Sequence, residues 1–240
     1  VRFLSTLPSG TYLAEIRQST GIVAVPFCFD GQADLSISVT APDGALDLSR
    51  FAYVAAGEFL AGGDDLAWQS RPKESIFLPN YAIGRRPVSC RTYCQFLNHL
   101  MTQEGMEVAR SRAPRSEPDG APLWPIEDGS FIVPNRDEKG MAWSPYWAVV
   151  NISAEDAEAF CLYFSDLHGQ VHRLPIEDEW EKAARGFDGR AFPWGDQWSP
   201  DRCHNRKATG GEPTRRAPAA FAADYSPYGL EGLAGGVVSG

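Results

Sequence analysis

The sequence predicts an α+β fold rich in irregular structure. Apolar residues recur at helical spacing near residues 89–101, 153–167 and 175–185, whereas they alternate with polar residues over 12–39, as strands do. The 23 Gly and 18 Pro residues indicate many turns. With 240 residues, 43% of them hydrophobic, the chain can hold one large domain, or one medium and one small domain.

Residues 1–50 are expected to form a small β unit, a meander within a small sandwich. Thr20-Gly21 and Asp30-Gly31 supply turns between three alternating runs: residues 12–17, 23–29 and 35–39. A Pro-Asp-Gly break at residues 42–44 then predicts a boundary, with the main domain over residues 51–240.

Two helices of the main domain carry their own capping signals. Ser153 and Asp156 form a capping box for one helix, which Gly169 ends. Ser89 can cap an earlier helix. The buried stripe of that earlier helix is expected to comprise Tyr93, Phe96, Leu97, Leu100 and Met101.

The segment between these helices, residues 102–147, is rich in Pro, Gly and charged residues. This composition predicts a long surface excursion, which is typical of a functional loop or of an insertion. Within it, residues 131–133 and 140–143 are expected to pair as a hairpin.

A third helix is predicted from Pro175 to Arg185. Proline suits a helix start, acidic residues crowd the first turn, and Gly186 provides a C-terminal cap. Two outer-face ion pairs are expected, Asp178–Lys182 and Glu181–Arg185. The inner stripe is expected to comprise Ile176, Trp180, Ala183 and Ala184. Residues 192–196, Phe-Pro-Trp-Gly-Asp, predict an aromatic-anchored turn.

The run RLPIEDEWEKAARG at residues 173–186, followed by PWGD at residues 193–196, resembles the hallmark of the formylglycine-generating enzyme family, also called sulfatase-modifying factors. The resemblance implies a variant of the C-type lectin-like fold and runs in order over residues 52–240. We interpret the motif as structural, because Arg–carboxylate pairs around a tryptophan-centred core need no substrate. Its fold-defining residues are identified as Arg173, Leu174, Pro175, Glu177, Glu179, Trp180, Arg185, Pro193, Trp194, Gly195 and Asp196.

The resemblance weakens towards the C-terminus. Catalytic members of the family oxidise a substrate cysteine to formylglycine with copper held by two Cys, downstream of a G-N-V-W-E-W motif. Here that motif reads GGVVSG, with Gly236, Val238 and Ser239 in place of Asn, Trp and Glu. Neither copper position lies within these residues, so we carry no catalytic residue over to this chain.

The cysteines of this chain are weaker metal candidates. Cys90 and Cys94 stand one helical turn apart, but they supply only two ligands beside an apolar stripe. We therefore expect part-buried thiols without a metal. Cys161 falls on a core face, and Cys203 with His204 forms a loop pair.

Calcium has one candidate ligand that the resemblance implies, Asn205, which follows the PWGD turn. Glu212 is the nearest acidic residue, and a second site would need a Glu where Ser239 stands. His168 and His172 flank a glycine and are expected to be exposed or hydrogen-bonded, and the iron motif H-x-x-x-H-x-E of related sulfoxide synthases is absent. We expect no bound cofactor, with calcium near Asn205 as the one candidate.

The net charge of −9 argues against nucleic acid and anionic membranes as partners. Five Cys and the lack of a signal peptide favour the cytoplasm over a secreted disulfide framework, and the longest apolar run, residues 21–29, is too short to span a membrane. A loose basic cluster is interpreted as a solvated loop: Arg202, Arg206, Lys207, Arg215 and Arg216.

Three functions fit these observations. The first is a non-catalytic module that binds a ligand or a protein, as in kinase-fused sensory domains and in variable proteins of diversity-generating retroelements. The stretch LPSGTYLAEI at residues 7–16 resembles a linker to a bacterial Ser/Thr kinase domain, although an ordinary packing module explains it equally well, and SPYG at residues 226–229 resembles both groups. The second is a copper-dependent oxidase of which this is a portion, and the third is a structural domain of a larger protein. We favour the first, because the scaffold motifs are present, whereas the motifs that carry copper and the second calcium are absent or altered.

Overall fold

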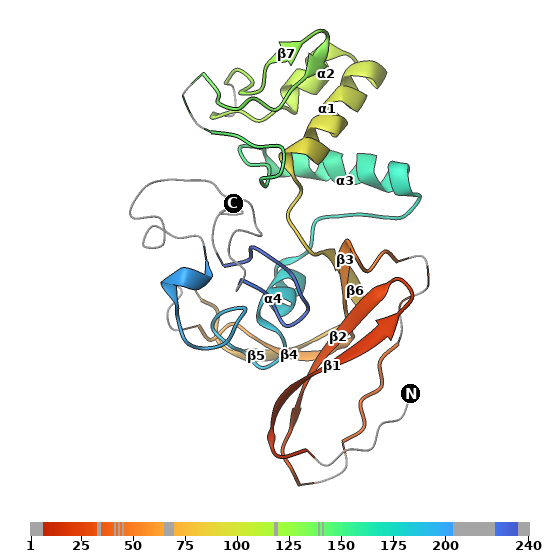
Figure 1. Ribbon diagram of the computed structural model, residues 1–240, viewed down its shortest axis with the longest axis vertical. Helices are drawn as coiled ribbons and strands as arrows, with labels where there is room; N and C mark the ends of the chain where they lie inside the picture. The colour runs from red at the N-terminus through yellow and green to blue at the C-terminus, as the bar shows by residue number, and fades with distance from the viewer. Residues whose placement is uncertain are drawn as a thin grey trace. The chain divides into compact units, whose positions relative to one another are not determined.

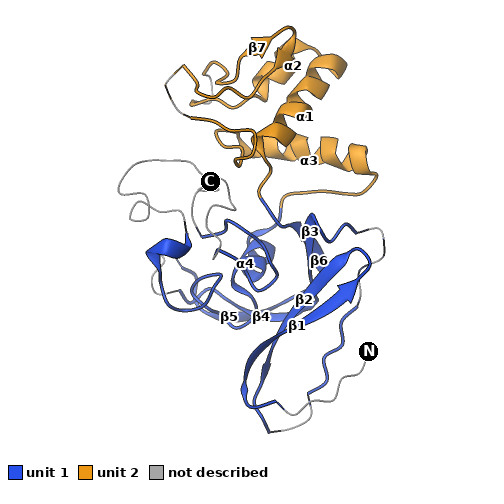
Figure 2. Ribbon diagram, in the orientation of Figure 1, with its two compact units in different colours: residues 1–86, 175–204, 221–234 blue, residues 87–174, 205–220, 235–240 orange. Residues whose placement is uncertain are grey.

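The computed structural model divides the chain into two compact units (Figures 1 and 2). Unit 1 comprises residues 1–86, 175–204 and 221–234, and unit 2 comprises the rest. These units differ from the predicted domains, 1–50 and 51–240, which stay a prediction. The structure describes residues 7–32, 35–40, 42, 44, 46–64, 70–117, 120–138, 140, 142–203 and 224–234.

Unit 1 begins with a long hairpin, visible as the red ribbon in Figure 1. β1 (Gly10–Gln18) pairs antiparallel with β2 (Gly21–Phe29), which confirms the pairing of the first two predicted runs. Alternation places the odd residues of β1 and the even residues of β2 on one face of the ribbon. The opposite face buries Val23 and Val25 in a cluster with Leu48.

The predicted third strand is wrong, because residues 35–40 contain no strand. Leu35 and Ile37 are 48% and 44% exposed, and of the three alternating residues only Val39 packs against the cluster of Val23 and Val25. The carbonyl of Thr40 accepts a hydrogen bond from the Tyr53 hydroxyl at 2.7 Å instead of joining a ladder. An alternating pattern makes a strand only where another strand meets its backbone groups.

Two short antiparallel pairs follow. β3 (Phe51–Val54) pairs with β6 (Tyr81–Gly84), and β4 (Gly57–Ala61) pairs with β5 (Glu74–Leu78). The opening run of the main domain, residues 52–63, is therefore two strands in two sheets, because the chain turns before Gly57.

α4 (Glu177–Arg185) completes unit 1, with a single 3-10 turn, η1 (Pro200–Arg202), after it. The helix begins two residues after Pro175, and Gly186 follows it with a φ of 80°, as a C-terminal glycine should. Ala183 of α4 lies in a buried cluster with side chains of β3 and of the C-terminal segment: Ala52, Val54, Tyr228 and Leu230.

The described part of unit 2 contains three helices and a minimal hairpin. These are α1 (Cys90–Gln103), α2 (Met106–Ser111), α3 (Ala154–His168), β7 (Ile126–Glu127) and β8 (Ser130–Phe131). The segment predicted as a long surface excursion contains α2 and the buried Trp124, so the prediction is wrong for these residues. The core is dominated by aromatic side chains: Tyr93, Phe96, Trp124, Phe131, Trp143 and Phe160.

The predicted caps of unit 2 are confirmed. Ser89 accepts the Thr92 N–H at 3.2 Å at the start of α1, and Ser153 and Asp156 form the capping box of α3. Gly169 ends α3 in the left-handed conformation, with a φ of 64°. The predicted stripe of α1 is buried except for Met101, which is partly buried.

The predicted hairpin of residues 131–133 with 140–143 is wrong. Phe131 pairs with Ile126 across a two-residue turn, Asp128-Gly129, both with positive φ. Asp-Gly is a favoured type I′ turn, and this signal decides the pairing. An isolated bridge joins Arg136, in the expected loop, with Ala142 of the expected second strand.

The mixture of helices and open two-stranded sheets confirms the α+β class. The C-type lectin-like assignment stays a prediction. Within the described ranges, no helix has the length and apolar character needed to cross a membrane.

Candidate functional site

The motif helix α4 is held by a buried acid and a buried lysine. Glu179 is 6% exposed and accepts the Ile176 N–H at 3.1 Å, which closes the first turn. Lys182 is 2% exposed, and its Nζ donates to the carbonyls of Ala55 at 3.0 Å and Gly57 at 2.9 Å. Burial lowers the pKa of Lys182 to about 8. The lysine thus fastens α4 to the turn between β3 and β4.

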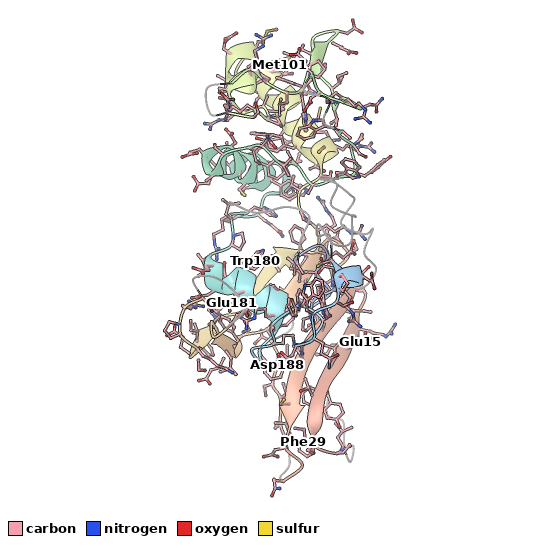
Figure 3. All side chains as sticks on the ribbon, turned by 90° about the vertical axis from the view of Figure 1, so that its left-hand side faces the viewer. Glu15, Phe29, Met101, Trp180, Glu181 and Asp188 are labelled. Atoms are coloured by element: carbon pink, nitrogen blue, oxygen red, sulfur yellow. The ribbon has the colours of Figure 1, made fainter. Side chains whose placement is uncertain are left out.

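Two members of the predicted inner stripe face solvent. Ile176 is 54% exposed and Trp180, marked in Figure 3, is 39% exposed, whereas Ala183 and Ala184 are buried as predicted. At about 100° per residue, Trp180 lies between Ala183 and Ala184 around the helix axis, but one turn nearer the N-terminal end, where Ile176 is also exposed. The prediction of a buried tryptophan at position 180 is therefore wrong.

The predicted pair Asp178–Lys182 is also wrong, because Asp178 pairs with Arg71 at 2.6 Å. Arg71 contacts Glu181 as well, at 3.0 Å. The predicted pair Glu181–Arg185 is confirmed. These groups link α4 to the segment before β5, and all four side chains are mostly buried.

The PWGD run forms a tight aromatic turn, as predicted. Phe192 and Gly195 exchange both backbone hydrogen bonds, at 2.9 and 3.0 Å. The rings of Phe192 and Trp194 stack with centroids 5.3 Å apart. Asp196 accepts the Ala191 N–H at 3.1 Å. These hydrogen bonds and this ring contact all join residues between Ala191 and Asp196.

The remaining motif residues mostly precede α4. Arg173, Leu174, Pro175 and Glu177 are exposed, and Pro193 is buried. Arg173 donates to the carbonyl of Leu174 at 3.0 Å. Their assignment as fold-defining stays a proposal.

The cysteines do not fit a copper centre. Cys90 and Cys94 are buried, and their thiols approach different carbonyls, those of Ala148 at 3.6 Å and Phe131 at 3.1 Å. Burial raises the pKa of Cys94 to about 11, whereas a copper ligand must be a thiolate. The described segments contain no group of three or more His, Cys, Asp and Glu side chains placed to hold a metal.

The two histidines considered as candidates both pack against the ring of one phenylalanine. His168 and His172 contact the ring of Phe164 at centroid distances of 4.1 and 4.8 Å. Each Nδ1 lies 2.9 Å from a backbone carbonyl, which confirms hydrogen-bonded histidines.

Of the other candidate residues, two cysteines are described, each away from other candidates, and the rest lie outside the described residues. Cys161 is half-buried on α3, and Cys203 is buried after η1. The described ranges do not include these residues: His204, Asn205, Arg206, Lys207, Glu212, Arg215, Arg216, Gly236, Val238 and Ser239.

A groove of about 400 Å³ lies between the hairpin and the turn at residues 226–229. Leu13 and Glu15 of β1, with Ile22 and Ala24 of β2, belong to its lining, and Figure 3 labels Glu15 on the ribbon. These residues occupy the ribbon face opposite Val23 and Val25, in agreement with strand alternation. The groove brings together the N-terminal β unit and the SPYG stretch.

Arg85 lines the groove and joins its walls. Its Nε donates to the carbonyl of Leu48 at 2.9 Å, and Nη2 donates to Ile22 at 3.2 Å. Nη1 donates to the carbonyls of Tyr228 at 3.1 Å and Gly229 at 3.2 Å. Burial lowers the pKa of Arg85, which still stays charged. Within the described chain, no carboxylate forms an ion pair with it.

The turn at residues 226–229 is shaped around this guanidinium. The Ser226 hydroxyl accepts the N–H groups of Tyr228 at 3.2 Å and Leu230 at 3.1 Å. Gly229 has a φ of 78°, and a Cβ there would lie 2.6 Å from Nη1 of Arg85. The SPYG stretch was singled out in the sequence but Arg85 was not, because nothing in the sequence distinguishes Arg85 from its neighbour Arg86.

A family model and a similar protein both relate this chain to one enzyme family. Residues 38–239 match a family described as "Sulfatase-modifying factor enzyme 1-like domain". The mouse (Mus musculus) protein named "Inactive C-alpha-formylglycine-generating enzyme 2" is 44% identical over 166 residues, which cover 62% of this chain and 52% of that protein. The chain thus spans about half the length of this relative.

Two further likenesses span more of the chain. A "Formylglycine-generating enzyme" of Thermomonospora curvata is 29% identical over 218 residues, which cover 77% of this chain and 68% of that protein. The structure of PvdO from Pseudomonas aeruginosa aligns with a TM-score of 0.52 at 14% identity, over 82% of this chain and 72% of that chain. At this identity the second likeness shows a similar fold only.

Proposed function

The chain belongs to the sulfatase-modifying factor family, and from this premise we propose that it is a non-catalytic module that binds a ligand or a protein. The observation that carries the proposal is the groove lined by the hairpin, Arg85 and residues 226–229. Concave sites with an apolar lining and a few polar groups are the usual form of ligand sites. The buried thiols of α1 contribute to the core of unit 2 instead.

The binding role resembles two uses of this scaffold. A kinase-associated sensory domain would present the groove beside its N-terminal β unit. A retroelement-diversified variable protein would vary side chains in its irregular C-terminal part, because such backbone tolerates exchange while the core stays fixed. The hairpin and the turn at residues 226–229 support both forms equally.

A second candidate function is a copper-dependent, formylglycine-generating oxidase of which these residues form a portion. The likeness to the Thermomonospora curvata enzyme, over 77% of this chain, favours it. The replacements Gly236, Val238 and Ser239 in the C-terminal motif count against it. The name of the mouse relative, an inactive enzyme, shows that the family is not uniformly catalytic.

A turnover assay separates the two candidates. The protein, with whatever sequence follows Gly240 in its natural form, is incubated with Cu(I), oxygen and a Cys-containing sulfatase peptide. We expect no aldehyde by mass spectrometry, while an active formylglycine-generating enzyme in a parallel reaction converts the same peptide. Copper-dependent turnover would overturn the non-catalytic proposal.

A further inference from the structure

We propose that the groove of unit 1 binds a carboxylate that stands beside an apolar group, with Arg85 as the residue that receives the carboxylate. This inference rests on the proposed binding role and specifies its ligand class. The shared chemistry belongs to small apolar carboxylic acids and to the C-terminus of a peptide that ends in an apolar residue.

The first observation is the charge of Arg85. Its guanidinium is surrounded by four carbonyl oxygens at 2.9 to 3.2 Å, which are neutral dipoles. The nearby carboxylate of Glu231 is bound at both oxygens by Arg86, each at 2.8 Å. A partly buried cation that lacks a carboxylate partner within the described chain favours an anion in its surroundings.

The second observation is the number of donors. A guanidinium has five N–H groups, and the four carbonyl contacts use one on Nε, two on Nη1 and one on Nη2. Among the residues that the structure describes, no acceptor is found for the second N–H of Nη2, which can therefore bind a ligand oxygen. The charge and this donor together give a carboxylate a charge-assisted hydrogen bond, which is stronger than a neutral one.

The third observation is the apolar lining. Leu13 is 50% exposed, and Ile22, Ala24 and Pro227 belong to the same groove. A volume of about 400 Å³ accommodates a ligand of the size of an amino acid derivative. An inorganic anion would leave this apolar surface in water, so it should bind less well.

Glu15 on β1 provides a test of whether the groove binds a negatively charged ligand. Its carboxylate lines the groove, and its ion pair with Arg17 is exposed at 3.4 Å, so the negative charge is only weakly offset. Glu15→Gln should therefore tighten the binding of a carboxylate, by about twofold because the site is screened by water. A purely structural role for the hairpin would not change affinity in this direction.

The experiment titrates N-acetyl-leucine into the whole chain and follows chemical shifts or heat. We expect binding in the millimolar range, about tenfold weaker binding of N-acetyl-leucinamide, and weak binding of acetate and inorganic phosphate. Gly-Gly-Leu with a free C-terminus distinguishes the two sources: tighter binding than N-acetyl-leucine assigns the site to peptide ends, and weaker binding assigns it to small acids.

Two variants locate the site. Arg85→Met should abolish binding, but it also removes four hydrogen bonds and can prevent folding. Ala24→Glu places a negative charge in the groove without removing any of these bonds and should weaken binding about tenfold. Cys28→Glu is the matched control, because it lies on the same face of β2 outside the groove lining and should bind like the parent.

Equal binding of the acid and the amide, unchanged binding by Ala24→Glu, or no binding of any probe at about 10 mM would overturn the inference. Its failure is distinguishable from failure of the proposed function. Peptide turnover with intact carboxylate binding contradicts the non-catalytic role alone, and absent binding without turnover contradicts only the ligand assignment.

Discussion

Arg85 and Gly229 approach each other closely: Nη1 of Arg85 donates to the Gly229 carbonyl at 3.2 Å, and a methyl group on Gly229 would lie 2.6 Å from the same nitrogen. Gly229 also has a φ of 78°, which L side chains rarely adopt. This contact forms part of the groove lining. Glycine is required here for two reasons: the positive φ disfavours other residues, and a Cβ would clash with Arg85.

Gly229→Ala should lower the free energy of unfolding by about 2–3 kcal/mol, because alanine is strained at this positive φ and its Cβ also clashes with Arg85. Gly140→Ala is the matched control, since Gly140 has the same φ of 78° and, among the described residues, no atom lies within 4 Å of the Cβ that alanine would add. Urea unfolding of both variants measures the difference. Equal losses would show that the contact with Arg85 contributes nothing.

Lys182 should make stability depend on pH in the alkaline range. Its pKa falls from 10.5 to about 8 on folding, so between these values the unfolded chain binds more protons, and stability rises with pH. Relative to that of Lys182→Met, the free energy of unfolding of the parent should rise by on the order of 2 kcal/mol between about pH 7 and pH 10.

Urea unfolding at several pH values measures this gain, and Lys73→Met, which removes an exposed lysine, should show no such trend against the parent. A parent-to-variant difference that stays flat with pH would contradict the burial of a lysine in this site.

Asp156 links the start of α3 to two arginines of unit 2. It is fully buried and binds Arg112 at 3.2 Å, Arg115 at 2.5 Å and the Ser153 N–H at 2.9 Å. Asp156→Asn removes the charge between two arginines and should cost about 3–5 kcal/mol, measured by urea unfolding with tryptophan fluorescence. Glu155→Gln, at the exposed neighbouring position, should change stability little; a comparable loss there would assign the effect to the helix dipole.

The thiols should differ in reactivity. Cys94 is buried, its pKa is raised to about 11, and its Sγ lies 3.1 Å from the Phe131 carbonyl, whereas Cys28 is exposed. Iodoacetamide on the native chain should modify Cys28 first and Cys94 only after denaturation. Peptide mapping by mass spectrometry measures both, and early labelling of Cys94 would contradict its place in the core.

Local signals predicted local structure well. The capping box of Ser153 and Asp156 and the left-handed Gly169 mark both ends of α3 in the sequence, and the helix has these ends. The errors also have local causes: the Asp128-Gly129 turn was a stronger hairpin signal than the apolar runs used instead.

Long-range relationships were not predictable in this way. Lys182 has the charge of a surface residue, and its acceptors, the carbonyls of Ala55 and Gly57, lie 127 and 125 residues away. Arg85 reaches carbonyls that are 63 residues before it and 144 after it along the chain. Because a single sequence does not state which distant segments meet, the motif helix was recognised but the groove was not.

The central claim is that this chain keeps the scaffold of its family while the thiols of Cys90 and Cys94 belong to the packed core of unit 2. The most direct measurement is an anaerobic competition titration of the 240-residue chain with Cu(I) and a chromophoric chelator. We predict no stoichiometric complex, because the thiols of Cys90 and Cys94 are buried and directed at different carbonyls. A one-to-one Cu(I) complex that is lost on Cys90→Ser or Cys94→Ser would contradict the claim.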